Sequence, residues 1–141
     1  MIKISKGLLA SDIRAYSEDG AKRKVAFHKD ARAFLRALAH EIGLSENSYD
    51  IRSNQGGVAV SGEVTLHAEH IYIQLSESCV SPGISVMYRT CAGRKDYTGG
   101  QNNFVSTQNL QLSDRQAAFV RSCRLLAKTY YMVDDRMCKA A

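Results

Sequence analysis

The chain has 141 residues, of which 45% are hydrophobic and 23% are charged, with a formal net charge of +5 and a pI of about 9.1. This composition is too apolar for a disordered tail, and the length is typical of one domain, so we predict a single domain over residues 1–141. The basic charge favours anionic partners such as nucleotides, nucleic acid or an acidic protein face.

Several classes of protein find no support in the sequence. The first ten residues are interrupted by Lys3 and Lys6, which is unlike the apolar core of a signal peptide, and no apolar run is long enough to span a bilayer. The four cysteines form no CxxC pair, so neither a zinc ribbon nor a thioredoxin-like site is indicated. We therefore expect a cytoplasmic protein with free thiols that uses no membrane, metal or cofactor.

Two elements are predicted in the first third of the chain. Asp19-Gly20 is a turn dipeptide and the residues that follow alternate in polarity, so Asp12–Phe27 is predicted to form a weak hairpin. A helix should follow and end at Gly43, a residue type common at helix C-termini. Its apolar stripe recurs at spacings of three and four and consists of Ala31, Phe34, Leu35, Leu38, Ala39 and Ile42.

Between Tyr49 and Phe104 the polarity pattern changes to a period of two. The expected strands are Val58–Leu66, Ile71–Leu75 and Ile84–Arg89. Gly62 is predicted to mark a bulge or a close contact, His67–His70 a turn, and Pro82-Gly83 a break. The short connections predict an antiparallel meander of three or four strands in this region.

The last predicted element is the longest helix. Ser113 and Gln116 have the spacing of a capping box at its start. Its narrow apolar stripe comprises Phe119, Cys123, Leu126, Tyr130, Val133 and Met137. Such a stripe fits packing on the domain's own sheet or on a second copy of the chain, as a homo-oligomer. The predicted fold class is α+β, with an antiparallel sheet of about four to six strands, a mid-chain helix and a long C-terminal helix.

The segment Tyr88–Phe104 is unusual because it combines cations, glycines, asparagines and an aromatic side chain. Arginine and lysine can neutralise phosphate, an aromatic ring can stack on a base, and glycines let the backbone approach a ligand closely. The candidate ligand-binding residues are Arg89, Arg94, Lys95, Tyr97, Gly99, Gly100, Asn102 and Asn103. A solvated hairpin loop that uses these residues only to turn is the alternative explanation.

A second stretch, Arg52–Gly57, has a similar composition, and Arg52 and Asn54 can complete the same pocket if both loops lie at one end of the sheet. Two ordinary turns explain the two stretches equally well. On the last helix, Arg121, Arg124 and Lys128 form a basic stripe that either contacts phosphate or faces solvent.

No local motif indicates catalysis. The sixth residue after Cys91 is Tyr97, where a cysteine phosphatase needs arginine. His67 and His70 form an HxxH in a predicted turn, without the helical spacing of a zinc protease, and no GxSxG elbow is present. Asp134-Asp135 lies near a terminus, where tuning of the carboxylates is not expected. We predict no catalytic residues, although a site built from residues distant in sequence leaves no local signature.

Together, the runs Tyr49–Gly57 and Arg89–Asn103 resemble small bacteriophage or mobile-element proteins, and in overall plan the phage Thoeris anti-defence sponges. That resemblance implies a homo-oligomer that sequesters a cyclic ADP-ribose-type signal without cleaving it. The leading hypothesis is therefore a non-enzymatic protein that binds an anionic, nucleotide-like small molecule. The alternative hypothesis is a small inhibitor or adaptor that docks on nucleic acid or a host protein through its basic surfaces.

Overall fold

A computed structural model describes residues 1–140, with side chains described through residue 128. The two long helices are α1 (Glu18–Glu41) and α2 (Ser113–Ala140). The strands between them are β1 (Tyr49–Asn54), β2 (Glu63–Ala68), β3 (Ile71–Glu77), β4 (Ile84–Gly93), β5 (Asp96–Gly99) and β6 (Asn103–Ser106). Short 3-10 helices occur at Lys6–Leu8, Glu46–Ser48 and Asn109–Gln111. The predicted α+β class, with a mid-chain and a C-terminal helix, is confirmed.

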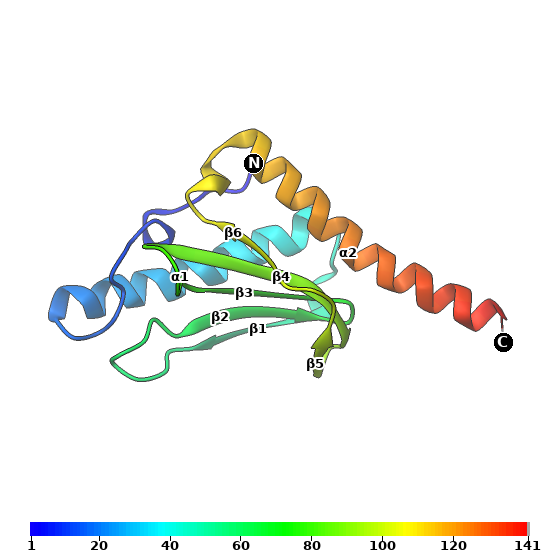
Figure 1. The fold of residues 1–141 in the computed structure, drawn as a ribbon, viewed down its shortest axis with the longest axis horizontal. Helices are drawn as coiled ribbons and strands as arrows, with labels where there is room; N and C mark the ends of the chain where they lie inside the picture. Colours follow the sequence, from blue (N-terminus) through cyan, green and yellow to red (C-terminus); the bar gives the residue numbers. More distant parts are fainter. Residues whose placement is uncertain (141) are drawn as a thin grey trace.

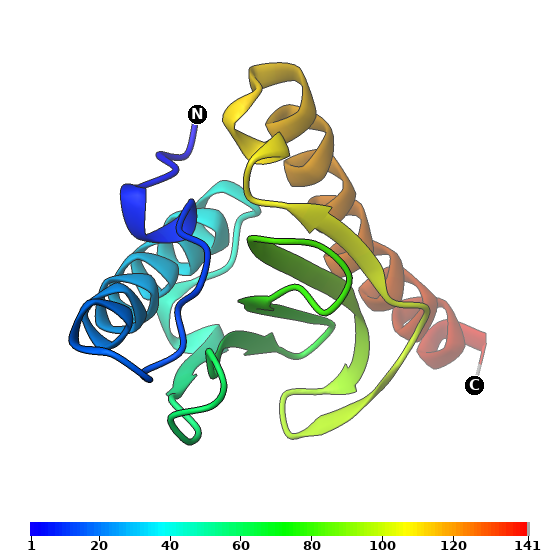
Figure 2. The same ribbon diagram turned by 60° about the vertical axis from the view of Figure 1, so that its left-hand side comes forward.

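The strands form one antiparallel sheet in the order β1-β2-β3-β4-β5, with β6 also paired to β4. Residues Ser85–Tyr88 of β4 pair with β6, whereas Cys91 and Gly93 pair with β5, and the β4–β5 register shifts between Cys91 and Gly93. The hairpin that leaves the sheet at this irregularity is called here the distal hairpin, residues 91–100. Figure 2 shows that the sheet is strongly curved and that this hairpin bends away from the line of β4.

Both helices pack on the same face of the sheet, and Figure 1 shows α1 running along it. The rings of Phe34 on α1 and Phe119 on α2 lie 6.5 Å apart, and Phe119 also meets Tyr88 of β4 at 5.1 Å. The core contains inward side chains of β2, β3 and β4 together with both helices. Within residues 1–140, no helix covers the opposite face of the sheet, which is called here the open face.

The predicted hairpin at Asp12–Phe27 is wrong, because α1 begins at Glu18. Ser17 caps the helix by accepting a hydrogen bond from the Gly20 backbone N–H at 3.0 Å, and Glu18 and Asp19 favour its N-terminus electrostatically. Gly20 serves close packing rather than a turn, since a Cβ there would collide with the Arg14 carbonyl. The predicted stop is confirmed, with Gly43 just past the helix at φ +82°.

The strand predictions need two corrections. β2 begins at Glu63, so Val58 and Val60 lie in the preceding loop with 61% and 49% of their surface exposed. His67 belongs to β2 rather than to the turn that follows it. Gly62 makes the expected close contact: its φ is +73°, and a Cβ would meet the backbone of Asn54 and Gln55.

α2 starts at Ser113 as predicted, but the amide of Gln116 does not close a capping box. It is buried and bonds to Ile2 and Leu110 instead. Of the predicted stripe, Phe119 and Cys123 are buried, while Tyr130, Val133 and Met137 lie outside the described side chains, as does Asp134-Asp135. Within the described residues, neither helix has the length and apolarity needed to cross a bilayer.

Candidate functional site on the open face of the sheet

Strand register aligns polar side chains in rows across the open face. The first row is Asp50, His67, Tyr72 and Arg89, one residue from each of β1 to β4. The second row is Arg52, Thr65, Gln74, Met87 and Phe104, from β1 to β4 and β6. Because side chains alternate along a strand, these residues share the face that the helices leave free.

The distal hairpin folds across the first row. The Tyr97 ring lies 5.0 Å from the His67 ring and 5.5 Å from the Tyr72 ring. Arg89 donates from Nη2 to the Tyr97 carbonyl at 2.6 Å. These contacts leave His67 only 1% exposed and Tyr72 6% exposed, although both lie on the face without a helix. The hairpin therefore closes one end of the open face and leaves Arg52 and Phe104 of the second row exposed.

Arg94 fastens the tip of the hairpin to β1. Its Nε and Nη2 donate to the two carboxylate oxygens of Asp50, both at 3.0 Å, and its Nη1 donates to the Asn47 carbonyl at 2.7 Å. This bidentate contact lowers the pKa of Asp50 below its usual range. The Arg94 guanidinium, which was predicted to bind phosphate, is thus bonded to Asp50 and Asn47 and positions the hairpin.

Two groups under the hairpin are polar but not exposed. His67 donates from Nε2 to the Gly93 carbonyl at 2.7 Å, which fixes the proton on that nitrogen. Cys91 is 1% exposed and its Sγ lies 3.2 Å from the Ala68 carbonyl. Burial raises the pKa of Cys91 to about 11, so the thiol stays protonated at neutral pH and is not a ready nucleophile.

Beyond the hairpin, the open face contains a hollow of about 520 Å³. Its wall residues come from β3, β4, β6, the β3–β4 loop and the β5–β6 loop: Gln74, Ser76, Glu77, Ser78, Cys79, Val80, Ser85, Met87, Asn102 and Phe104. The Phe104 ring is 66% exposed, so it offers an aromatic surface to a ligand. The volume is within the usual range for sites that take small molecules.

Arg89 connects the hairpin to this hollow. Its Nη1 donates to Asn102 Oδ1 at 3.3 Å, and its guanidinium carbon lies 5.2 Å from the centre of the Tyr72 ring. Its Nε is buried without a hydrogen-bond partner among the described residues. Arg52 reaches the same region from β1, where its Nη1 lies 3.4 Å from the Tyr97 hydroxyl. Two arginines thus flank Tyr97, one held rigidly and one more than half exposed.

The other predicted site residues have local structural contacts. Lys95 is exposed at the tip of the hairpin. Gly99 packs against the Thr90 backbone, and the Gly100 N–H donates to the Thr90 hydroxyl at 3.1 Å. Asn103 donates to the Tyr88 and Gln101 carbonyls, and Asn54 accepts from the Gly56 N–H. The structure therefore brings together Arg52, Arg89, Tyr97 and Asn102, and places Asn54 and Asn103 elsewhere.

Sequence reasoning missed the strand residues that form the floor of the site. Gln74 and Met87 are paired across β3 and β4, and Phe104 is paired with Met87. Alternation along each strand was a usable signal, since Tyr72 and Gln74 have the same parity. The register between strands, which places Gln74 beside Met87, has no signal in a single sequence.

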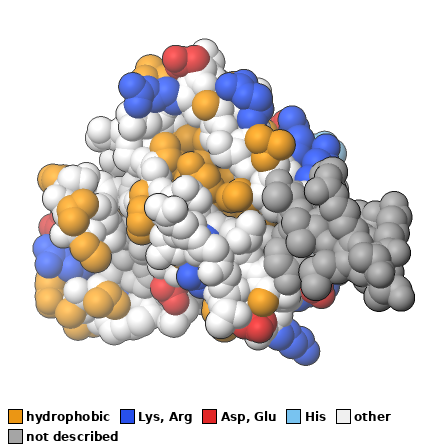
Figure 3. Space-filling model, turned by 45° about the vertical axis from the view of Figure 1, so that its right-hand side comes forward, with side chains coloured by type: hydrophobic (Ala, Val, Ile, Leu, Met, Phe, Trp, Pro, Cys, Tyr) orange, Lys and Arg blue, Asp and Glu red, His pale blue; other side chains and the backbone are white. Residues whose placement is uncertain are grey.

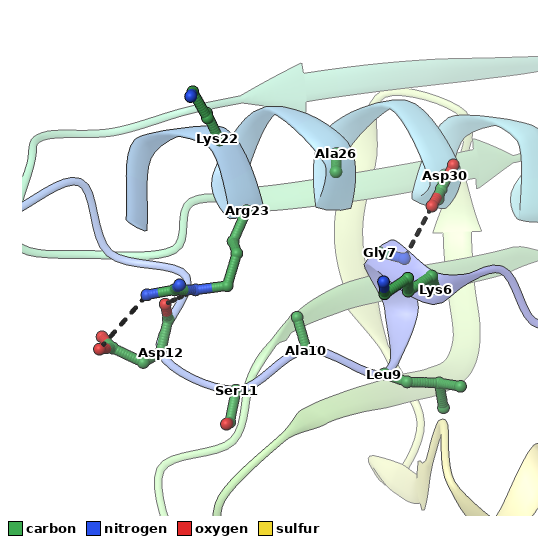
Figure 4. A pocket seen from close by; sticks show the side chains of 10 residues that line it. All are labelled: Lys6, Gly7, Leu9, Ala10, Ser11, Asp12, Lys22, Arg23, Ala26 and Asp30. Carbon is green, nitrogen blue, oxygen red and sulfur yellow. Dashed lines mark hydrogen bonds and ion pairs between the residues drawn. The ribbon is translucent and has the colours of Figure 1, made fainter. Parts of the chain in front are cut away.

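A larger hollow of about 900 Å³ lies between the N-terminal segment and α1 (Figure 4). Several of its charged groups are paired. Arg23 donates to the Asp12 carbonyl at 2.9 Å and lies 3.7 Å from the Asp12 carboxylate, and Asp30 accepts from the Gly7 N–H at 2.9 Å. Lys22 pairs with Glu18 at 3.6 Å. Two of the three cations that line this hollow, Lys22 and Arg23, are therefore partly neutralised by carboxylates.

Within the described side chains, no group of three or more His, Cys, Asp or Glu residues is arranged to hold a metal ion. Comparison with protein-family models, curated protein sequences and solved structures finds no significant match to this chain. The arguments for function therefore come from the geometry of the chain itself.

Proposed function

We propose that this protein binds an anionic, nucleotide-like small molecule on the open face, without changing it chemically. Arg89 and Arg52 neutralise the phosphate, and the base lies against Phe104 over the hollow. The observation that carries the proposal is the placement of Arg89, whose side chain is bonded to Asn102 on the wall of that hollow. The resemblance to the Thoeris sponges adds that the protein sequesters this ligand in an anti-defence role.

Preorganisation is the physical reason to favour Arg89 as the phosphate ligand. Its guanidinium is fixed by the Tyr97 carbonyl, the Asn102 side chain and the Tyr72 ring before any ligand arrives. Less side-chain entropy is then lost on binding than for a free arginine. Arg52 is 53% exposed and lies 3.8 Å from the Asp50 carboxylate, and we assign it the second contact.

The positive region of the open face is limited in extent. One row beyond Arg52, β2 places Glu63 on the same face, opposite Ser76 of β3. A phosphate is therefore favoured at the hairpin end, and the uncharged part of the ligand should point toward the serines. This polarity favours a compact nucleotide over a long polyanion, which needs positive charge along its whole length.

The protonation of two buried cysteines also supports binding without chemical conversion of the ligand. Burial raises the pKa of Cys91 to about 11 and that of Cys123 to about 12, so neither thiol is a thiolate at neutral pH. Tyr72 beside the site has a pKa raised above its usual range, chiefly by burial, so it remains a neutral phenol. All three groups are buried and uncharged at neutral pH, so none of them is placed to attack a ligand on the open face.

Isothermal titration calorimetry with ADP-ribose tests the proposal. The wild-type protein should bind, and Arg89→Ala should weaken binding at least tenfold, since a hydrogen bond to a charged group contributes about 1.5–3 kcal/mol. Arg52→Ala should weaken binding less, because its side chain is more exposed. The matched control is Arg36→Ala, which removes an exposed cation from α1. Equal affinity in all four proteins, or no binding to the wild type, would count against the proposal.

A second candidate function is docking on nucleic acid or on a host protein. Figure 3 shows hydrophobic side chains gathered in the middle of one face, with Lys and Arg side chains near its edges. On α2, Arg121 and Lys128 are exposed, whereas Arg124 donates to the Glu41 carbonyl at 2.7 Å. Salt separates the two functions: affinity for nucleic acid falls log-linearly and steeply with salt, and affinity for one small ligand falls much less.

A further inference from the structure

The segment Arg52–Gly57 contains a serine whose hydroxyl is held by a buried histidine. Ser53 lies on β1 and is exposed, whereas His28 lies on α1 and is 1% exposed. Ser53 Oγ and His28 Nδ1 are 2.6 Å apart. Ser53 is paired with Val64, a core residue on the helix side of the sheet, so this contact is on the other side from the open face.

The direction of the hydrogen bonds can be assigned from the partners. His28 Nε2 lies 2.9 Å from the Ser61 carbonyl, and a carbonyl can only accept, so Nε2 carries the proton. Nδ1 of the neutral ring is then an acceptor, and the Ser53 hydroxyl donates to it. Arg32 donates from Nη1 to Ser53 Oγ at 3.3 Å. The serine therefore has a base on one side and a cation on the other.

The surroundings keep His28 in the form that can accept a proton. Burial, opposed by the hydrogen bond to Ser61 and reinforced by the charges of Lys24 and Arg32, lowers the pKa of His28 below its usual value. Lys24 is fixed nearby because its Nζ donates to the Gly57 carbonyl at 2.9 Å. At neutral pH the imidazole is unprotonated, which a general base requires.

We propose that Ser53 and His28 form a nucleophile–base pair that transfers acyl groups from small carboxylic esters. The pair has the signature expected of an activated nucleophile: hydroxyl and base within hydrogen-bond reach, and the base oriented by a third group, here the Ser61 carbonyl. Ser53 is an exposed residue of the edge strand β1, and its contact with His28 is partly buried.

The reaction balances with an ester and water alone. Ser53 Oγ attacks the carbonyl carbon while its proton moves to His28 Nδ1. The tetrahedral intermediate then expels the alcohol, which takes the proton from His28 and leaves acyl-Ser53. Water attacks the acyl group, gives a proton to His28, and releases the acid as Ser53 Oγ regains its proton. Arg32 favours the negative charge that develops beside it.

A purely structural role predicts different chemistry. A hydrogen bond that only ties α1 to β1 leaves Ser53 no more reactive than other exposed serines of the chain. A nucleophile–base pair makes it selectively reactive in the folded protein. A fluorophosphonate probe distinguishes the two, because it phosphonylates activated serines with loss of fluoride, and mass spectrometry of peptides locates the label.

We expect the label on Ser53 of the wild-type protein, no label in Ser53→Ala, and at least tenfold slower labelling in His28→Gln. p-Nitrophenyl acetate should give a burst of p-nitrophenolate that is lost in Ser53→Ala and at least tenfold slower in His28→Gln. The rate should fall with decreasing pH with a midpoint below about pH 6.5, the ordinary histidine pKa, because the pKa of His28 is lowered.

The control serine is Ser81, which is exposed and has no histidine contact in the described structure. Labelling of Ser81 equal to that of Ser53, or labelling of Ser53 no faster than in urea-unfolded protein, would overturn the proposal even if His28→Gln failed to fold. Ser53 should be labelled normally in Arg89→Ala, since Arg89 and the hollow lie on the open face, on the other side of the sheet. Loss of ADP-ribose binding and loss of Ser53 reactivity are thus separable results.

Discussion

Among the residues singled out in the sequence, glycines illustrate how the same residue type serves different purposes. Gly99 lies where β5 meets β4, and a Cβ at this position would overlap the Thr90 carbonyl oxygen. Gly57 lies in the β1–β2 loop, and a Cβ there would have no atom within 4 Å. Both belong to Gly-Gly pairs and were indistinguishable in sequence. Of these two glycines, only Gly99 is required for the hairpin to pair with the sheet.

This difference predicts the effect of adding one methyl group. Gly99→Ala should lower the free energy of unfolding by about 1–3 kcal/mol, because β5 must move away from β4 to admit the side chain. Gly57→Ala is the matched control and should change stability by less than about 1 kcal/mol. Urea denaturation followed by circular dichroism measures both. Equal effects of the two substitutions would show that Gly99 is not in close contact with Thr90.

At the scale of elements, one buried amide joins the N-terminal segment to the start of α2. Gln116 on α2 accepts from the Ile2 N–H, and it donates to the Ile2 carbonyl at 2.8 Å and to the Leu110 carbonyl at 2.9 Å. The N-terminal segment thereby gains backbone partners that no strand provides. Gln116 is 2% exposed, so water cannot replace these bonds if the amide is removed.

Gln116→Ala should therefore lower the free energy of unfolding by about 2–3 kcal/mol, since it leaves buried backbone groups of Ile2 without partners. Gln111→Ala, an exposed position in the preceding 3-10 helix, should have little effect. Hydrogen exchange at the Ile2 amide should accelerate in Gln116→Ala alone. If protection of Ile2 is unchanged, the amide does not hold the N-terminal segment.

For the whole molecule, stability should depend on pH in two separate windows. The pKa of His28 is lowered in the folded protein, so below about pH 6.5 the unfolded chain binds a proton that the folded protein does not. The free energy of unfolding must then fall as pH falls toward the lowered pKa. The pKa of Asp50 is also lowered, by Arg94, so its contribution is present above about pH 4 and is lost below that value.

Urea denaturation between pH 3 and pH 8 checks both windows. The dependence between about pH 6.5 and pH 5 should become shallower in His28→Asn, and the loss below about pH 4 should become shallower in Asp50→Asn. Glu46→Gln provides the control, because Glu46 is exposed and lies outside both long helices. Profiles that match the wild type in both variants would show that these two contacts do not control acid stability.

The elements that sequence alone determined are those specified by local pattern. The apolar spacing from Ala31 to Ile42 and the stop at Gly43 gave the C-terminal half of α1, and alternation from Ile71 to Leu75 gave β3. The start of α1 was missed because Asp19-Gly20 is typical of turns, while the cap at Ser17 depends on its bond to the Gly20 N–H. A turn signal and a helix-capping signal overlap at these residues. The close contact between Gly20 and the Arg14 carbonyl forms in the helix and has no signal in the sequence.

Tertiary structure decided which of the predicted site residues lie beside the hollow on the open face. The composition of residues 88–104 predicted that its arginines bind phosphate. In the structure, Arg94 is bonded to Asp50, 44 positions earlier, whereas Arg89 is bonded to Asn102 on the wall of the hollow. Likewise, the contact between Ser53 and His28 joins a strand to a helix 25 residues away. Periodicity fixes which face of an element a side chain occupies, because it reflects local backbone geometry. Which faces then meet depends on register and packing between distant segments, and these are properties of the folded chain.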